Sequence, residues 1–471
     1  MRWRDAVTPE PMTRLALVAP AWAVRDALVE VAAAGTVDLD PGVRGEQPVS
    51  EAAHRLQRLA SSSPAAPRLC RHAPDLAELE RDGRADLLAG EAELAGYATQ
   101  AVVRGDVAAL LGWVPSARLP DLAARLRRVD AAAAALPVPR GVQPPTAPRQ
   151  GVARRTFGPL VDTYATVPYA DIDPSILAGL AYLVMFGAMF GDVGHGLLLV
   201  LVALLIRFGR LARLGPLRPH WLFVAGAGLT AALFGFAYGE FFGPTGVVPV
   251  GWLSPMDQPE KLLIAGIGLG AVLLAGAYAL GTVNRVREGG WALGLYAPSG
   301  FAGSLLFLAA GLAAFAWYAD AGWAWTAAVV VAVLGLVLAF VGLLAAAGGK
   351  AAGVLQAAIE LVDLVIRLGA NVVSFARLAA FGLTHAVLGW IVWQATVGLW
   401  HVGPLAALGA IVVFVLGNAL AFALEALVAG VQALRLEYYE LFSRVFQTEG
   451  KAFQPWHVAV EPSTGTAEEA P

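Results

Sequence analysis

Several ionisable residues lie inside long apolar stretches of this chain. Arg377 occupies the middle of NVVSFARLAAFGLTHAV, which runs from Asn371 to Val387, with Ser374 three residues before it and His385 eight residues after it. On insertion scales, an arginine or a carboxylate at the centre of a membrane helix costs about 2.5–3.5 kcal/mol. Residues of this kind need partners or a water-filled cavity, and they are typical of proton relays and ion pathways.

The polar residues of the two most C-terminal apolar segments form stripes. If 353–400 is a helix that turns about 100° per residue, its polar residues fall within an arc of roughly 120°. The residues of this arc are Glu360, Asp363, Arg367, Asn371, Ser374, Arg377 and His385. In 404–446 a polar residue recurs every seven positions and therefore stays on one helix face, with Arg435 on its flank; these residues are Asn418, Glu425, Gln432 and Tyr439.

The stripes allow two interpretations. In the structural one, the charges pair with each other, Glu425 with Arg377 and Asp363 with Arg367 at i,i+4 spacing. In the functional one, they line an ion path, and the mixture of carboxylates, histidine and amides suits proton hopping. Arginine is not deprotonated in proteins and cannot relay a proton. It can attract a carboxylate and force it to ionise, and a mobile carboxylate has to come from another chain.

The composition excludes several classes of protein. The 471 residues are 58% hydrophobic and only 15% charged, whereas soluble domains are about a quarter charged. The net charge of −3 argues against a nucleic-acid partner. A single cysteine, Cys70, excludes an internal disulfide and a cysteine metal cage. No G-x-x-x-x-G-K-[ST] motif occurs, so we expect no nucleotide site, no catalytic site, no cofactor and no metal.

Seven apolar runs indicate a multi-pass membrane protein: 176–206, 219–241, 261–282, 299–318, 322–347, 353–400 and 404–446. Loops with Arg or Lys alternate with loops that have none. The positive-inside rule then requires the first run to cross twice, with its turn at Asp192–Gly194 in FGDVGHG. We therefore predict a mainly α fold of eight transmembrane helices with both termini cytoplasmic. The run 353–400 would be about 70 Å long as a helix, against a hydrocarbon core of about 30 Å, so the last two helices should be tilted.

We expect four regions along the chain: a shortened cytoplasmic α/β domain at 1–143, an entry segment at 144–175, the membrane domain at 176–446 and a cytoplasmic tail at 447–471. Residues 13–40 and 100–129 each read as strand, helix and strand, the second with a turn at Gly112–Pro115, and the stretch between them reads as helical. The tail after Trp456 reads as disordered. FGDVGHG reads as a structural hairpin; Asp192 and, more weakly, Glu240 are candidates for a channel mouth.

Four motifs in order resemble subunit I, also called subunit a, of the rotary V/A-type ATPases. They are the entry segment PPTAPRQGVARRTFGPLVDTYATVPYADIDPS, MFGAMFGDVGHGLLL, VSFARLAAFGLTHAVL, and LEALVAGVQALRLEYYELFSRVFQTEGKAFQPW. The resemblance covers about Pro144 to Trp456. It implies that Arg377 is the essential arginine facing a proteolipid ring and that Arg435 is a second arginine. It also implies that polar positions line two half-channels; these are His385, Glu425, Asp363 and Gln432.

The resemblance further implies a stator subunit of a proton-translocating ATPase or ATP synthase in a prokaryotic plasma membrane. Its partners would be the proteolipid (c/K) ring, peripheral-stalk subunits, a central-stalk or rotor adaptor subunit and membrane lipid. Only about 50 residues separate the two N-terminal lobes, where the family has a long coiled coil. The alternatives are a secondary transporter or ion exchanger, for which internal repeats are expected but not evident, and a non-transporting scaffold.

Overall fold

The computed structural model describes residues 8–40, 50–59, 66–139, 141–149, 151–209, 215, 218–348, 351–446 and 449–461. The chain forms two compact units. A helical unit lies within Gln150–Glu449, and an α/β unit combines residues of Pro9–Arg149 with residues of Gly450–Pro471.

The α/β unit is built on two strand–helix–strand segments, as the sequence predicts. They are β1 (Met12–Pro20), α2 (Val24–Ala34) and β2 (Asp38–Leu39), then β5 (Val107–Pro115), α6 (Leu119–Leu126) and β6 (Ala132–Leu136). The strands lie in the order β2-β5-β1-β6, and all of these pairs are antiparallel. This is the split βαβ arrangement of ferredoxin-like folds. The short β4 (Val102–Arg104) pairs with β5 at the edge.

The turn predicted at Gly112–Pro115 is wrong, because these residues belong to β5 and the turn follows Pro115. Gly112 pairs with Leu15 on one side and with Leu39 on the other. A Cβ atom at Gly112 would lie 2.8 Å from the carbonyl oxygen of Asp38. Gly112 therefore allows two strand backbones to approach closely, as glycine inside a strand often does.

The stretch between the two segments is helical, as predicted, with α3 (Glu51–Arg58), α4 (Leu76–Arg81) and α5 (Ala85–Ala98). It also contributes the strand β3 (Arg68–Cys70). This strand pairs in parallel with β7 (Ala459–Glu461), from the other end of the chain. The prediction that the chain is disordered after Trp456 is therefore wrong for residues 457–461.

Trp456 anchors the C-terminal segment to the α/β unit. Its side chain is buried, its ring lies 4.7 Å from that of Tyr97, and its Nε1 donates to Glu93 (3.2 Å). We expect Trp456→Ala to destabilise this unit by about 3–5 kcal/mol. Hydrogen exchange in the intact chain should show faster exchange in β3, with the exposed Trp22→Ala as the matched control. Unchanged protection of β3 would contradict this role.

The helical unit consists of α7 (Val152–Tyr164), α8 (Ser175–Met189), α9 (Val193–Arg207), α10 (Trp221–Tyr238), α11 (Pro259–Tyr296), α12 (Phe301–Ala319), α13 (Gly322–Ala346), α14 (Ala351–Ser374), α15 (Ala376–Trp400) and α16 (Pro404–Leu436), then the π-helix η4 (Glu437–Phe442) and α17 (Ser443–Val445). Within the described residues, six helices are long and apolar enough to cross a membrane. They are the helix that includes α10, then α11, α12, α13, α14 with α15, and α16 with its extension.

α8 and α9 are shorter, at 15 residues each, so eight crossings remain a prediction. The break between them falls at Phe190–Asp192, beside the predicted turn at Asp192–Gly194. Asp192 caps α9, because its Oδ1 accepts from the backbone N–H of His195 (2.8 Å). Its Oδ2 accepts from the backbone N–H of Gly243 (2.9 Å), which ties the hairpin to the loop after α10.

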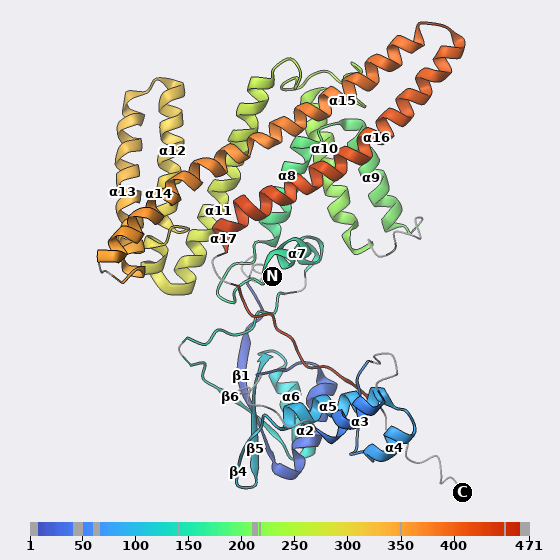
Figure 1. Ribbon diagram of the computed structural model, residues 1–471, viewed down its shortest axis with the longest axis vertical. Helices are drawn as coiled ribbons and strands as arrows, with labels where there is room; N and C mark the ends of the chain where they lie inside the picture. Colours follow the sequence, from blue (N-terminus) through green and yellow to red (C-terminus); the bar gives the residue numbers. More distant parts are fainter. Residues whose placement is uncertain are drawn as a thin grey trace. The chain divides into compact units, whose positions relative to one another are not determined.

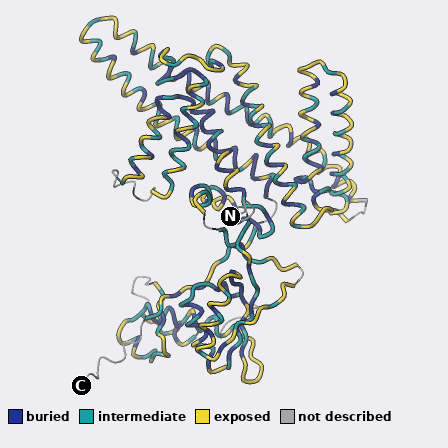
Figure 2. Tube along the Cα trace, turned by 180° about the vertical axis from the view of Figure 1, so that it is seen from behind, coloured by how far each residue is buried: buried dark blue, intermediate teal, exposed yellow. Residues whose placement is uncertain are grey.

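The last two segments are long and run side by side. α14 and α15 continue each other with only a turn at Phe375, and α15 packs against α16. Figure 1 shows this pair running obliquely to the α12–α13 hairpin. Figure 2 shows that α12 and α13 are mostly exposed, whereas burial concentrates where α8, α10, α15 and α16 meet. The stripe residues on α15 and the middle of α16 thus lie in the best-packed part of the helical unit, whereas Glu360, Asp363 and Arg367 on α14 are exposed.

A buried acid lies in the entry loop between α7 and α8. The Asp171 side chain is fully buried, 3.8 Å from Arg285 Nη2, and Arg285 Nη1 is 2.6 Å from Glu288. Burial and the neighbouring Glu288 raise the pKa of Asp171 from 3.8 to about 7. A folded-state pKa above the unfolded one means that the folded protein binds more protons between these values. Stability therefore falls as the pH rises from about 4 to 7.

We expect Asp171→Asn to remove the part of the decrease in stability with rising pH that Asp171 causes. The drop in unfolding temperature between pH 5 and pH 8, followed by tryptophan fluorescence, should be smaller in the variant than in the wild type. The reason is that the variant has no carboxyl group to ionise at this buried position. Asp257→Asn, at an exposed position, should leave the slope unchanged. An identical slope in Asp171→Asn and wild type would contradict the assignment.

Candidate ion-translocation site

Arg377 lies in a cluster of charged and amide side chains where α14, α15 and the end of α16 meet. Its Nε donates to the Ser374 carbonyl (3.1 Å), and its Nη2 is 3.4 Å from Glu440 Oε1. The Arg377 side chain keeps 26% of its surface exposed, against 9% for Glu440. The charge of Arg435 also acts on Arg377 from α16. Arg377 is therefore held at its base while its guanidinium remains accessible.

Asn371 and Arg444 extend this cluster on the side of Glu440. With its amide oriented to satisfy both neighbours, Asn371 donates to Glu440 Oε2 (2.8 Å) and to the Arg367 carbonyl (3.0 Å), and it accepts from Arg444. Each oxygen of Glu440 then has a separate partner. We call Arg377, Arg435, Glu440, Asn371 and Arg444 the arginine cluster.

The predicted pair of Glu425 with Arg377 is wrong. Glu425 instead pairs with His385, through its Oε2 and the His385 Nδ1. Arg377 pairs with Glu440 because the pitch of the last helix changes after Leu436, where α16 ends and η4 begins. In the π-helix η4 the hydrogen bonds run from i to i+5, so the seven-residue stripe no longer stays on one face. Tyr439, expected on the stripe, is 70% exposed, and Glu437 and Glu440 are buried instead.

A second cluster surrounds His385, which is buried on α15. It contains His385 and Glu425, with Asp192 and His195 from the start of α9 and Glu240 from the loop after α10; we call it the histidine cluster. His195 and His385 approach with ring centroids 5.6 Å apart, and the His195 Nδ1 is 3.8 Å from Asp192 Oδ1. Three carboxyl groups and two imidazoles thus share a largely buried space.

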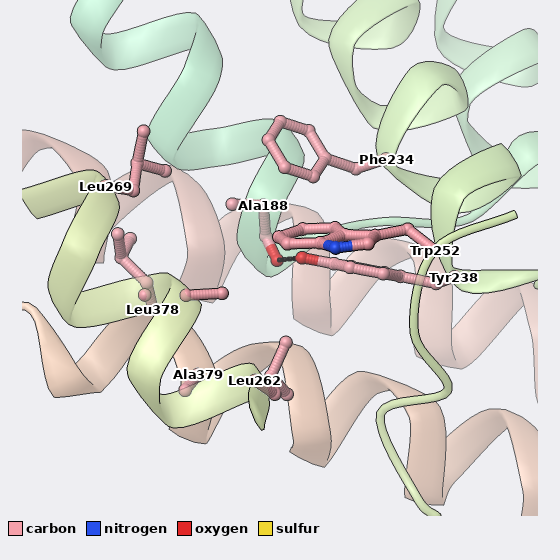
Figure 3. Close-up of a pocket in the computed structure, with 10 residues that line it drawn as sticks. Ala188, Phe234, Tyr238, Trp252, Leu262, Leu269, Leu378 and Ala379 are labelled. Carbon is pink, nitrogen blue, oxygen red and sulfur yellow. Dashed lines mark hydrogen bonds between the residues drawn. The ribbon is translucent and has the colours of Figure 1, made fainter. Parts of the chain in front are cut away.

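The two clusters lie at different levels of the same helix pair. Eight residues separate Arg377 from His385 on α15, which is about 12 Å of helix. Beside this stretch lies an apolar cavity of about 280 Å³. Figure 3 shows that its walls are hydrocarbon and that the Tyr238 hydroxyl is turned to the Ala188 carbonyl, to which it donates (3.2 Å). An apolar cavity of this kind offers water too few partners to form a wire between the clusters.

The other predicted site residues lie in three environments. Asp363 pairs with Arg367 as predicted (2.7 Å), but both are exposed on α14, and the exposed Glu360 accepts from Gln356 (2.9 Å). These side chains belong to neither cluster. Ser374 contributes its carbonyl to Arg377, whereas Gln432 is half-buried with its Oε1 unpartnered among the described residues.

The sequence did not predict three residues of the clusters, His195, Glu440 and Arg444, nor the neighbouring Glu437. Glu437, Glu440 and Arg444 escaped because a regular helical period does not describe η4 and α17. His195 was read as part of a structural turn, because its partner His385 is 190 positions away in the chain. The two carboxylates of LEYYELF, three residues apart in an apolar segment, were the only available signal for Glu437 and Glu440.

The fold and the polar helix pair define a multi-pass membrane protein with a small α/β unit. The V-type ATPase 116 kDa subunit family model matches residues 98–211. A-type ATP synthase subunit I of Archaeoglobus fulgidus is 26% identical over 417 residues, covering 74% of this chain and 58% of that protein. Subunit I of Pyrococcus horikoshii is 25% identical over 79% of this chain and 57% of that protein.

The chain is therefore similar to subunit I of the V/A-type ATPases over most of its length. V-type ATP synthase subunit I 2 of Treponema pallidum is 29% identical over 34% of this chain. The chain spans a little more than half the length of the curated A-type relatives it matches, 58% and 57% of the first two.

Proposed function

We propose that this chain is the stator subunit of a rotary V/A-type H⁺-ATPase or ATP synthase, with Arg377 as the cation that a moving carboxylate of a proteolipid ring meets. The observation that carries the proposal is the state of Arg377. It is a permanent cation within an apolar helix pair, held by Ser374 and Glu440, with part of its surface still accessible.

Two clusters on one helix pair suit two offset half-channels. The histidine cluster would deliver protons between the outer side and the ring carboxylate, with Asp192 and Glu240 at its mouth. The arginine cluster, together with Gln432, would serve the other side. Asp363 and Glu360 lie beyond it on α14 and would attract protons at the entrance. The apolar wall between the clusters would prevent protons from bypassing the ring.

Arg377 would cause the ring carboxyl group to release its proton by electrostatic attraction. A carboxylate near a guanidinium has a lowered pKa and releases its proton. At about 4 Å and an effective dielectric constant of about 20, such a pair is worth about 4 kcal/mol. Glu440 holds the same guanidinium from the other side, so the encounter with the ring need not be permanent. Rotation then brings the next protonated carboxyl group.

The orientation that we propose places both termini in the cytoplasm of a prokaryotic cell. The Arg-rich end of α9 would face the same side, and the turn between α15 and α16 would face outward. Peripheral-stalk subunits and a rotor adaptor subunit would contact the cytoplasmic parts, and the ring would contact α14, α15 and α16.

Purification of the tagged chain from native membranes tests this function. A rotary stator should co-purify with a small proteolipid and with ATPase subunits, and the reconstituted complex should acidify vesicles only when ATP is supplied. A secondary transporter or ion exchanger would instead move ions as the isolated chain. Ion movement by the isolated chain, or purification without a proteolipid, would contradict the stator function.

A further inference from the structure

We infer that Asp192, His195 and His385 form a Zn²⁺ site within the histidine cluster. One donor atom from each of these three buried residues can be chosen so that all three lie within 4.8 Å of one another. Two imidazoles and one carboxylate are a frequent set of protein ligands for zinc, with a fourth position left for water or another oxygen. The set is assembled from two segments, the start of α9 and α15, which lie 190 residues apart in the chain, so the sequence of either segment alone does not reveal it.

The state of His195 is the independent evidence for a ligand. Its side chain is 2% exposed, and neither ring nitrogen has a hydrogen-bond partner among the described residues. The Asn418 amide on α16 is a polar neighbour of the ring, and its Oδ1 also has no hydrogen-bond partner among the described residues. A buried polar group without a hydrogen-bond partner destabilises the folded state. Coordination through one nitrogen would satisfy a group that the surrounding protein leaves unpaired.

Aromatic packing fixes the His195 ring without occupying its nitrogens. Phe190 stacks on it at 5.7 Å, and Phe242 meets it edge-on at 5.2 Å. Such contacts explain why a ring lies here, and an apolar ring would make them as well. They do not explain why this position holds a histidine and not an apolar aromatic residue. The contacts hold the imidazole in the fixed orientation that a metal ligand requires.

Glu425 prepares His385 for the same role. The carboxylate binds the His385 Nδ1 and leaves the Nε2 for a metal, and metal-bound histidines usually have such a carboxylate on the second nitrogen. The two oxygens of Asp192 each accept one backbone N–H, but a carboxylate oxygen has a second lone pair for a metal. Glu240 is a third carboxyl group nearby, with one buried oxygen unpartnered among the described residues.

The geometry predicts a small movement on binding. Zinc bonds of about 2.0–2.1 Å in a tetrahedron place neighbouring donor atoms about 3.4 Å apart. The closest nitrogen–oxygen pair, between His195 and Asp192, is 3.8 Å apart. The ion would therefore draw the three side chains together by rotamer adjustments within the hairpin, without a change of fold.

Equilibrium binding of Zn²⁺ to the purified full-length chain in lipid nanodiscs, against a chromophoric chelator, tests the site. This measurement does not depend on whether the chain moves protons. We expect one zinc ion per chain. Glu425→Gln should weaken binding by about 10–100-fold, because it removes the carboxylate behind His385. His195→Gln should weaken it further, and His401→Gln, on a histidine outside the cluster, should leave it unchanged.

A ligand exchange makes the test independent of folding defects. In a Cys70→Ser background, which removes the only cysteine, His195→Cys should still bind the probe ion Co²⁺ and give a new thiolate-to-metal absorption band. X-ray absorption of the wild type should show two histidine nitrogens at about 2.0–2.1 Å from zinc. A wild type that binds zinc no more tightly than His195→Gln, or a coordination shell of oxygens alone, would overturn the site.

Discussion

Membranes that contain Arg377→Gln should lose ATP-driven proton pumping by at least about 100-fold. If the guanidinium contributes about 4 kcal/mol to ionisation of a ring carboxylate, its loss corresponds to about 1,000-fold in rate. Asn371 would remain paired with both Glu440 and Arg444, so the variant should still fold. Quenching of a pH-sensitive dye in inverted vesicles measures the effect.

Two further variants separate charge from structure. Arg377→Lys keeps a cation but loses the planar donor set that reaches Ser374 and Glu440, so it should retain an intermediate rate. Arg207→Gln, at the end of α9 where the guanidinium lies 4.8 Å over the Trp221 ring, should pump as the wild type does. Pumping by Arg377→Gln above half of the wild-type rate would exclude the role proposed for Arg377.

Glu425→Gln should reduce pumping by about 100-fold or more, because proton-transfer groups contribute about 10²–10⁴-fold when placed in a reaction path. Glu425 is paired with a buried histidine, and removal of one member of a buried pair leaves the other without its partner. His385→Gln should therefore have a similar effect, and the double variant should be little worse than either single variant.

The double-mutant cycle measures this coupling directly. Residues in contact have interaction energies of about 0.5–3 kcal/mol, whereas separated residues add within about 0.5 kcal/mol. Glu260→Gln, at an exposed position at the start of α11, is the matched control and should leave pumping unchanged. Additive effects of the two single variants would show that Glu425 and His385 act separately, against the pairing observed here.

The parts of the fold that follow from the sequence are those set by one local pattern. Hydropathy places the long helices, and the polar, glycine-rich GDVGHG predicts the break between α8 and α9. Alternation of apolar residues predicts the two strand–helix–strand segments. The pair Asp363–Arg367, which the structural interpretation of the stripes includes, is present, because i,i+4 spacing on one helix fixes its geometry.

The parts that the sequence did not reveal depend on a change of helix pitch or on distant contacts. The π-helix places Glu440 beside Arg377, whereas a uniform 3.6-residue helix would continue the stripe toward Tyr439. His195 and His385 are brought together because α8, which precedes the turn to α9, packs against α15 and α16; periodicity within one segment does not describe such a contact. The pairing of β7 with β3 likewise needs two segments almost 390 residues apart.

Because β3 pairs with β7, the α/β unit cannot be completed until the C-terminal segment has been synthesised. β3 leaves the ribosome early, but its partner follows almost 390 residues later, after the whole of residues 150–449. At about 5–20 residues per second, this delay is about 20–80 s. Throughout that time the edge of β3 has no partner strand. The apolar helices between residues 150 and 449 are all made before β7 pairs with this edge. The α/β unit therefore matures last, although most of its residues are made first.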